Sequence, residues 1–209
     1  MPGRYAAAMT ALAAAVAIAA LPAGSAPRPQ DPDWPCQQRL VPKLVAASYW
    51  SGPPPEALGD WHDDPQVAQL VHRLAPRRVS TEAGLSAIEA FAHALSGDRA
   101  RRLALAFQGL LDETNRERSA LIDELKGIGR RQRELAELVG RLGAALDAVP
   151  PDATGEAATR RIDLQQRYNF TALNFEEIQR TIRYACEAPV ALDARLGAWA
   201  RALQKAASV

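Results

Sequence analysis

Residues 103–149, LALAFQGLLDETNRERSALIDELKGIGRRQRELAELVGRLGAALDAV, carry the pattern that decides the fold. Two series of positions alternate along this stretch at spacings of four and three residues, which is the a/d repeat of a coiled coil. The first series is Phe107, Thr114, Leu121, Ile128, Leu135, Leu142 and Val149, and the second is Leu111, Arg118, Leu125, Gln132, Val139 and Leu146. The repeat predicts one long helix with a stripe to bury, which is far more often a structural or binding element than an active site.

A second long helix is predicted over residues 155–187, after the helix-breaking sequence Pro150-Pro151-Asp152. Its seam again has heptad spacing and consists of Leu164, Tyr168, Thr171, Phe175, Ile178, Ile182 and Ala185. A short connection between two long helices predicts an antiparallel hairpin. Gly127 and Gly129 lie level with Phe175 in this hairpin, so they either make room for the phenyl ring or form a hinge.

Shorter helices are predicted before and after the hairpin from apolar periodicity and from capping residues such as Asp64, Ser80 and Asp98. Their approximate ranges are residues 38–50, 64–75, 80–95 and 190–206. The predicted fold is therefore all-α, with a small multi-helix head and a long antiparallel helical hairpin, coiled-coil-like, as an arm. The head takes about residues 38–113 and 188–209, and the arm takes about residues 114–187.

The N-terminus has the features of a secretory signal peptide, predicted over residues 1–25. An alanine-rich apolar stretch covers residues 5–21, and small residues follow it, so cleavage after Ser25 or after Ala26 fits the pattern. The alternative is an uncleaved anchor helix, which the shortness of the stretch and its alanine content disfavour. The signal predicts a periplasmic or secreted bacterial protein, without stable membrane insertion after cleavage.

The two cysteines, Cys36 and Cys186, both lie in the predicted mature chain. Two cysteines in an oxidising compartment usually pair, so we expect a Cys36–Cys186 disulfide, with two free thiols or an intermolecular link as alternatives. Residues 26–37 form a proline-rich segment that we expect to be extended. The disulfide would dock this segment near the base of the hairpin.

Charge and motifs exclude several classes of function. Removing Arg4 with the signal lowers Lys plus Arg from 25 to 24, against 24 Asp plus Glu, so the mature chain is neutral and a nucleic-acid partner is not expected. No Gly-x-Ser-x-Gly, Cys-x-x-Cys or phosphate-binding glycine loop is present, and no cofactor is predicted. His62 stands among Asp60, Asp63 and Asp64, which could bind a metal, but a helix-capping, solvated turn is the favoured interpretation.

Five residues are candidates for binding a partner. Thr114, Arg118 and Gln132 interrupt the apolar seam, and either set the register of the hairpin or mark a surface that a partner covers. Trp34 and Trp50 stand beside prolines, and either fill the core of the head or form a recognition surface.

The expected function is that of a non-enzymatic exported protein. Its hairpin arm would bind a partner protein of the cell envelope, as an adaptor, a scaffold or a chaperone-like factor. One alternative is a small-molecule or metal-binding helical domain that uses the head. Another is a self-assembling structural protein whose arms pair into four-helix bundles.

Overall fold

The structure is a computed structural model that describes residues 31–208, and this part of the chain is all-helical. The predicted signal peptide and residues 26–30 lie outside the described residues. The short 3-10 helices are η1 (Ala46–Ser48), η2 (Pro55–Leu58) and η3 (Trp61–Asp63). The α-helices are α1 (Pro65–Leu74), α2 (Thr81–Ala94), α3 (Arg99–Asp147), α4 (Glu156–Ala185) and α5 (Glu187–Ala207).

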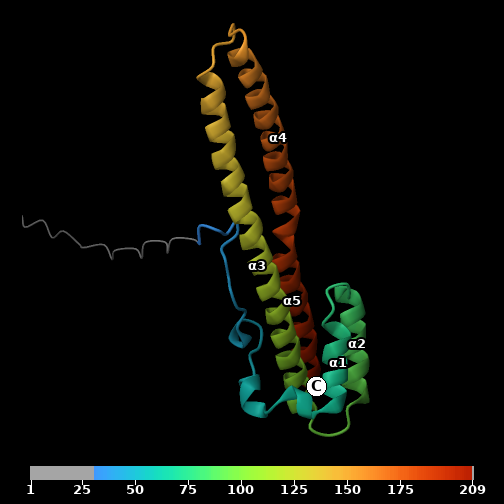
Figure 1. Cartoon of the computed structure of the whole chain (residues 1–209). Coiled ribbons are helices and arrows are strands. Elements are labelled where there is room, and N and C mark those ends of the chain that lie inside the picture. The colour runs from blue at the N-terminus through green and yellow to red at the C-terminus, as the bar shows by residue number, and fades with distance from the viewer. Residues whose placement is uncertain (1–30, 209) are drawn as a thin grey trace, which may run out of the picture.

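The long antiparallel hairpin is confirmed and extends along the whole molecule. Helix α3 has 49 residues, which corresponds to about 74 Å at 1.5 Å per residue. Helices α4 and α5 follow one another along its side, and α1 and α2 pack at the opposite end from the hairpin turn (Figure 1). This all-α architecture agrees with the predicted head and arm.

The last helix begins earlier than predicted, at Glu187 instead of Val190, and follows α4 after the single residue Cys186. Pro189 therefore lies within the first turn of α5. The N–H groups of a first turn have no partner within the helix, so proline is tolerated there. As a result, α4 and α5 form an almost continuous partner for α3.

The predicted helix over residues 38–50 is wrong, because this segment is extended and contains only η1. Pro42 lacks a backbone donor, and the side chain of Asn115 supplies partners that a helix would otherwise provide. Its Oδ1 accepts from the N–H of Leu44 at 2.8 Å, and its Nδ2 donates to the carbonyl of Leu44 at 3.0 Å.

The capping prediction for Asp98 is also wrong, since its side chain makes no cap hydrogen bond, whereas Asp64 and Ser80 cap α1 and α2.

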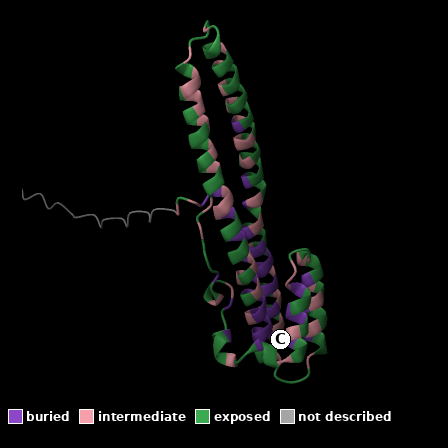
Figure 2. Cartoon of the chain, viewed as in Figure 1, coloured by how far each residue is buried: buried purple, intermediate pink, exposed green. Residues whose placement is uncertain are grey.

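Burial divides the hairpin into two parts (Figure 2). Near the base, α3 packs against α5, α1 and the 3-10 segments around a core that includes Phe107, Leu110 and Trp199. Residues 130–170, which we call the distal arm, contain no buried residue. The distal arm is thus a layer of two helices whose shared seam stays half-exposed.

Candidate functional site

An extended segment, residues 31–45, runs beside α3 and α5 and is called the strap here (Figure 1). Its first residues are held by charge. The carboxylate of Asp31 lies 2.8 Å from Lys126 Nζ, and that of Asp33 lies 3.0 Å from Arg130 Nη1 and also contacts Arg133. The hydrogen bond from Lys126 lowers the pKa of Asp31, and those from Arg130 and Arg133 lower the pKa of Asp33.

The middle of the strap is held by an apolar cluster and by the predicted disulfide, which is confirmed. Cys36 and Cys186 are bonded with their Cα atoms 5.7 Å apart. The side chains of the surrounding cluster are Trp34, Ile122, Leu125 and Ile182. Gln38 Nε2 donates to the carbonyl of Cys186 at 2.6 Å, so the strap is joined to the α4–α5 junction both covalently and by a hydrogen bond.

Gly129 allows the strap to approach α3 closely. A Cβ atom at this position would overlap the carbonyl oxygen of Asp33 and crowd Pro35. The glycine therefore makes room for the strap and not for Phe175, which is the correction to the packing hypothesis. Helix α3 continues without a break through Gly127 and Gly129.

Arg118 interrupts the apolar seam because it joins three segments inside the protein. Its Nη1 donates to the carbonyl of Pro189 at 2.5 Å and its Nη2 to the carbonyl of Val41 at 2.9 Å. Its side chain is only 5% exposed, and this burial lowers the pKa of the guanidinium. Arg118 therefore positions the strap and the start of α5, and its surface is covered by the chain itself.

Four of the five candidate partner-binding residues are interior. Thr114 and Arg118 are buried in α3, Trp34 of the strap is buried against Ile122 and Leu125 of α3, and Trp50 stacks on Phe107 with ring centroids 5.1 Å apart. Gln132 alone among the five is partly accessible.

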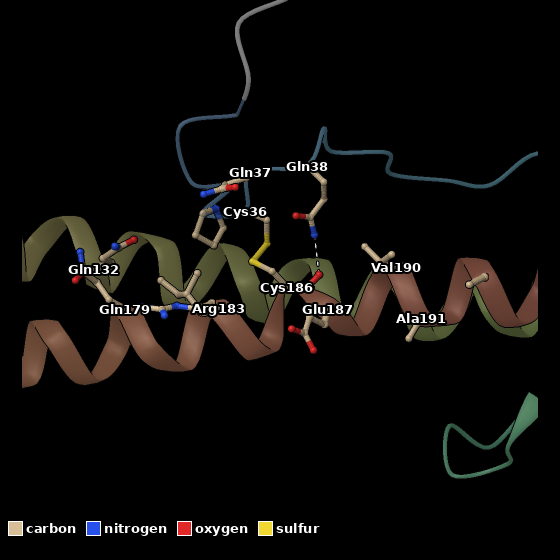
Figure 3. A pocket seen from close by; sticks show the side chains of 13 residues that line it. Cys36, Gln37, Gln38, Gln132, Gln179, Arg183, Cys186, Glu187, Val190 and Ala191 are labelled. Atoms are coloured by element: carbon tan, nitrogen blue, oxygen red, sulfur yellow. Dashed lines mark hydrogen bonds between the residues drawn. A yellow bond between two sulfur atoms is a disulfide. The ribbon is translucent and has the colours of Figure 1, made fainter.

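Gln132 lines an open groove of about 830 Å³ beside the disulfide. The groove is formed by the strap, α3, α4 and α5, and the disulfide lies at its centre (Figure 3). Its other polar side chains are Gln37, Gln38, Gln179, Arg183 and Glu187. These groups can donate and accept hydrogen bonds, and they carry one positive and one negative charge.

The outward face of α4 carries exposed apolar side chains that the sequence interpretation missed. They are Ile162, Phe170, Leu173 and Tyr184, exposed by 60%, 69%, 61% and 73%, and we call them the outer stripe. At 3.6 residues per turn they fall within about 80° of the helix circumference, opposite the seam that faces α3. A helical projection of α4 that considers both faces would have found them.

Two negative observations apply to the described part of the chain. Within residues 31–208, no group of three or more His, Cys, Asp or Glu side chains is arranged to hold a metal ion. His62 Nδ1 instead lies 2.6 Å from Asp60, while Asp64 caps α1 and pairs with Arg102. No helix in this range is both long and apolar enough to cross a membrane.

The geometry therefore contains two accessible features, the groove beside the disulfide and the outer stripe of α4. Comparison with known protein families, curated proteins and solved structures finds no match to this chain.

Proposed function

We propose that this chain is an exported, non-enzymatic protein whose hairpin arm docks a partner protein of the cell envelope, as an adaptor, scaffold or chaperone-like factor. The observation that carries the proposal is the outer stripe, four large apolar side chains exposed along one face of α4. Exposed apolar surface marks interaction sites on proteins. Ile162, Phe170 and Leu173 lie on this face with no charged residue between them, and Glu177 and Arg180 separate them from Tyr184. The Cys36–Cys186 disulfide supports a periplasmic or secreted location, since such bonds persist in oxidising compartments.

The arm suits docking because its distal part, residues 130–170, contains no fully buried residue. A partner helix or sheet laid on the outer stripe would bury Phe170 and Leu173 without disturbing the seam between α3 and α4. The base supplies the stability, since the large buried side chains gather there. The arm can therefore present apolar residues on a rigid support.

The test is site-specific photo-crosslinking of the full chain in its native compartment. A crosslinker at Leu173 should capture a defined protein, and the product should disappear when Phe170→Asp is added. A crosslinker at Arg141, which is exposed on α3 away from the outer stripe, is the control. Equal capture from Arg141 and Leu173, or capture that survives Phe170→Asp, would contradict docking at this face.

A second candidate function rests on the groove beside the disulfide. Its volume of about 830 Å³ is large enough for a small molecule, and its amide side chains could bind a polar ligand. Screening small polar compounds by thermal shift, with Gln132→Ala and Gln179→Ala as paired variants, tests this candidate. A response that both variants retain would exclude the groove.

A further inference from the structure

The part of the outer stripe nearest the hairpin turn has an unusual composition for an exposed helix face. Ile162, Phe170 and Leu173 are all more than half exposed, and the residues that lie between them on this face are the uncharged Gln166 and Asn169. Exposed helix faces of monomeric proteins usually carry charge. This uncharged apolar patch is therefore suited to contact another helix.

Charge enters along one edge of the patch as a pair of opposite sign, and at its end as Glu177, which is exposed one turn beyond Leu173. Arg167 Nε lies 3.0 Å from Asp163 Oδ2, and both side chains are more than half exposed. The two residues are separated by one helical turn and flank the patch on the same side.

We propose that this patch docks on the same patch of a second copy of the chain, with the two α4 helices antiparallel and a two-fold axis near Gln166. The axis brings Ile162 of one copy opposite Phe170 of the other, because these residues are equally distant from Gln166. It also brings Asp163 of one copy beside Arg167 of the other. Ile162 and Phe170 then meet twice by symmetry, as do Asp163 and Arg167, while Leu173 lies level with Thr159 of the other copy.

This self-complementarity favours a second copy over an unrelated partner. A contact around a two-fold axis needs one patch that complements itself, and the Asp163–Arg167 pair lets this patch do so in charge. The full chain adds no strong opposing field, since its 25 basic and 24 acidic residues nearly balance. This self-contact rests on the proposed function of the arm as a docking element. It identifies a second copy of the chain as the protein that docks on this patch.

The same axis leaves Tyr184 outside the contact. Its counterpart across the axis would fall near residue 148, before the first residue of α4, Glu156. Tyr184 and the groove therefore stay available to a different partner. The helical bases of the two copies, where α1 and α2 pack, point in opposite directions. The result is a two-headed scaffold.

The contact is a single pair of helices, and stable interfaces bury roughly 1,200–2,000 Å² in total. We therefore expect association that depends on concentration. Sedimentation and light scattering of the oxidised mature chain, from micromolar to millimolar concentration, should show mass rising from monomer toward dimer. Ile162→Asp and Phe170→Asp should remain monomeric, whereas Tyr184→Asp should associate like the wild type.

Charge reversal tests the axis. Asp163→Arg alone should weaken association by about tenfold, because two exposed attractive pairs become repulsive. Adding Arg167→Asp to Asp163→Arg should restore it. A second measurement uses cysteines: Gln166→Cys should form an intermolecular disulfide, and Leu173→Cys should not, since an antiparallel two-fold brings only residues near the axis together.

Several outcomes would overturn the inference. A strict monomer at millimolar concentration excludes the dimer, and a dimer that survives Ile162→Asp excludes this patch. A charge swap that fails to recover association, or equal cross-linking at Gln166 and Leu173, excludes the antiparallel axis. The proposed function is tested separately, because capture of a different protein at Leu173 by a strictly monomeric chain would support that function and reject the self-contact.

Discussion

The two halves of α3 carry the same repeat but have different surroundings. Leu125 lies in the half beneath the strap and is 2% exposed, whereas Leu146, three heptads later in the same series, is only half-buried. The difference comes from the number of neighbours. The strap adds a third layer at Leu125, while at Leu146 the partner is α4 alone. An apolar repeat therefore specifies which face of a helix is buried, and the neighbouring segments decide how deeply.

The strongest test of this comparison removes the bond that fastens the strap. The paired change Cys36→Ser and Cys186→Ser opens a loop with a sequence separation of 150, and chain-entropy arguments give a loss of about 5 kcal/mol in the free energy of unfolding. Urea unfolding measures the loss. Hydrogen exchange should accelerate in residues 31–45 but not in the distal arm. Equal acceleration in both regions would contradict a local role for the disulfide.

Matched leucine truncations should differ between the two halves. Leu125→Ala removes a fully buried side chain and should cost about 2–5 kcal/mol. Leu146→Ala removes a half-exposed one and should cost about 1 kcal/mol or less. Chemical denaturation of the two variants gives both values. A cost at Leu146 as large as that at Leu125 would mean that the distal seam is buried in solution, as a partner on that seam would cause.

Two glycines of α3 should respond in opposite directions. Gly140→Ala meets no other group within 4 Å and should stabilise the protein by about 0.5–1 kcal/mol, because alanine favours a helix. Gly129→Ala would push the Asp33 carbonyl away and should destabilise it by about 1–2 kcal/mol. Thermal unfolding reports both signs. Stabilisation by Gly129→Ala would show that the strap does not lie against α3 at this point.

Acid should release the charged end of the strap. The folded pKa values of Asp31 and Asp33 are lowered by their basic partners, so the ion pairs stabilise the fold above the unfolded value, about 3.9. That contribution is lost as pH falls through the lower folded values. Hydrogen exchange of residues 31–35, corrected for intrinsic rates, should rise over this range while that of α2, whose cap is the hydroxyl of Ser80, stays constant.

Asp33→Asn is the matched control for this acid release. Its exchange at neutral pH should already resemble that of the acidified wild type, because the pairs with Arg130 and Arg133 are weakened. An Asp33→Asn variant that keeps wild-type protection at neutral pH would indicate that the disulfide and the Trp34 cluster hold the strap without help from charge.

Local pattern was enough to predict much of this architecture. Helix positions depend on signals that lie close together in the sequence. These signals are the heptad series, the prolines after Val149 and the caps at Asp64 and Ser80, and together they specify the helices and an antiparallel hairpin. The pairing of Cys36 with Cys186 followed from there being two cysteines in the chain.

The candidate sites were far less predictable, because they depend on which distant segments meet. Arg118 has the sequence context of a partner-facing polar residue, but Val41 and Pro189, more than seventy positions away, take up its hydrogen bonds. The strap is neither a helix nor a strand, so its sequence has no periodic pattern to predict it. Part of its backbone hydrogen bonding is supplied by side chains of α3 such as Asn115. Sequence periodicity thus determined the helices and their order. Tertiary contacts alone decided which polar residues became interior, because the partners of Arg118 and Asn115 come from segments far away in the chain.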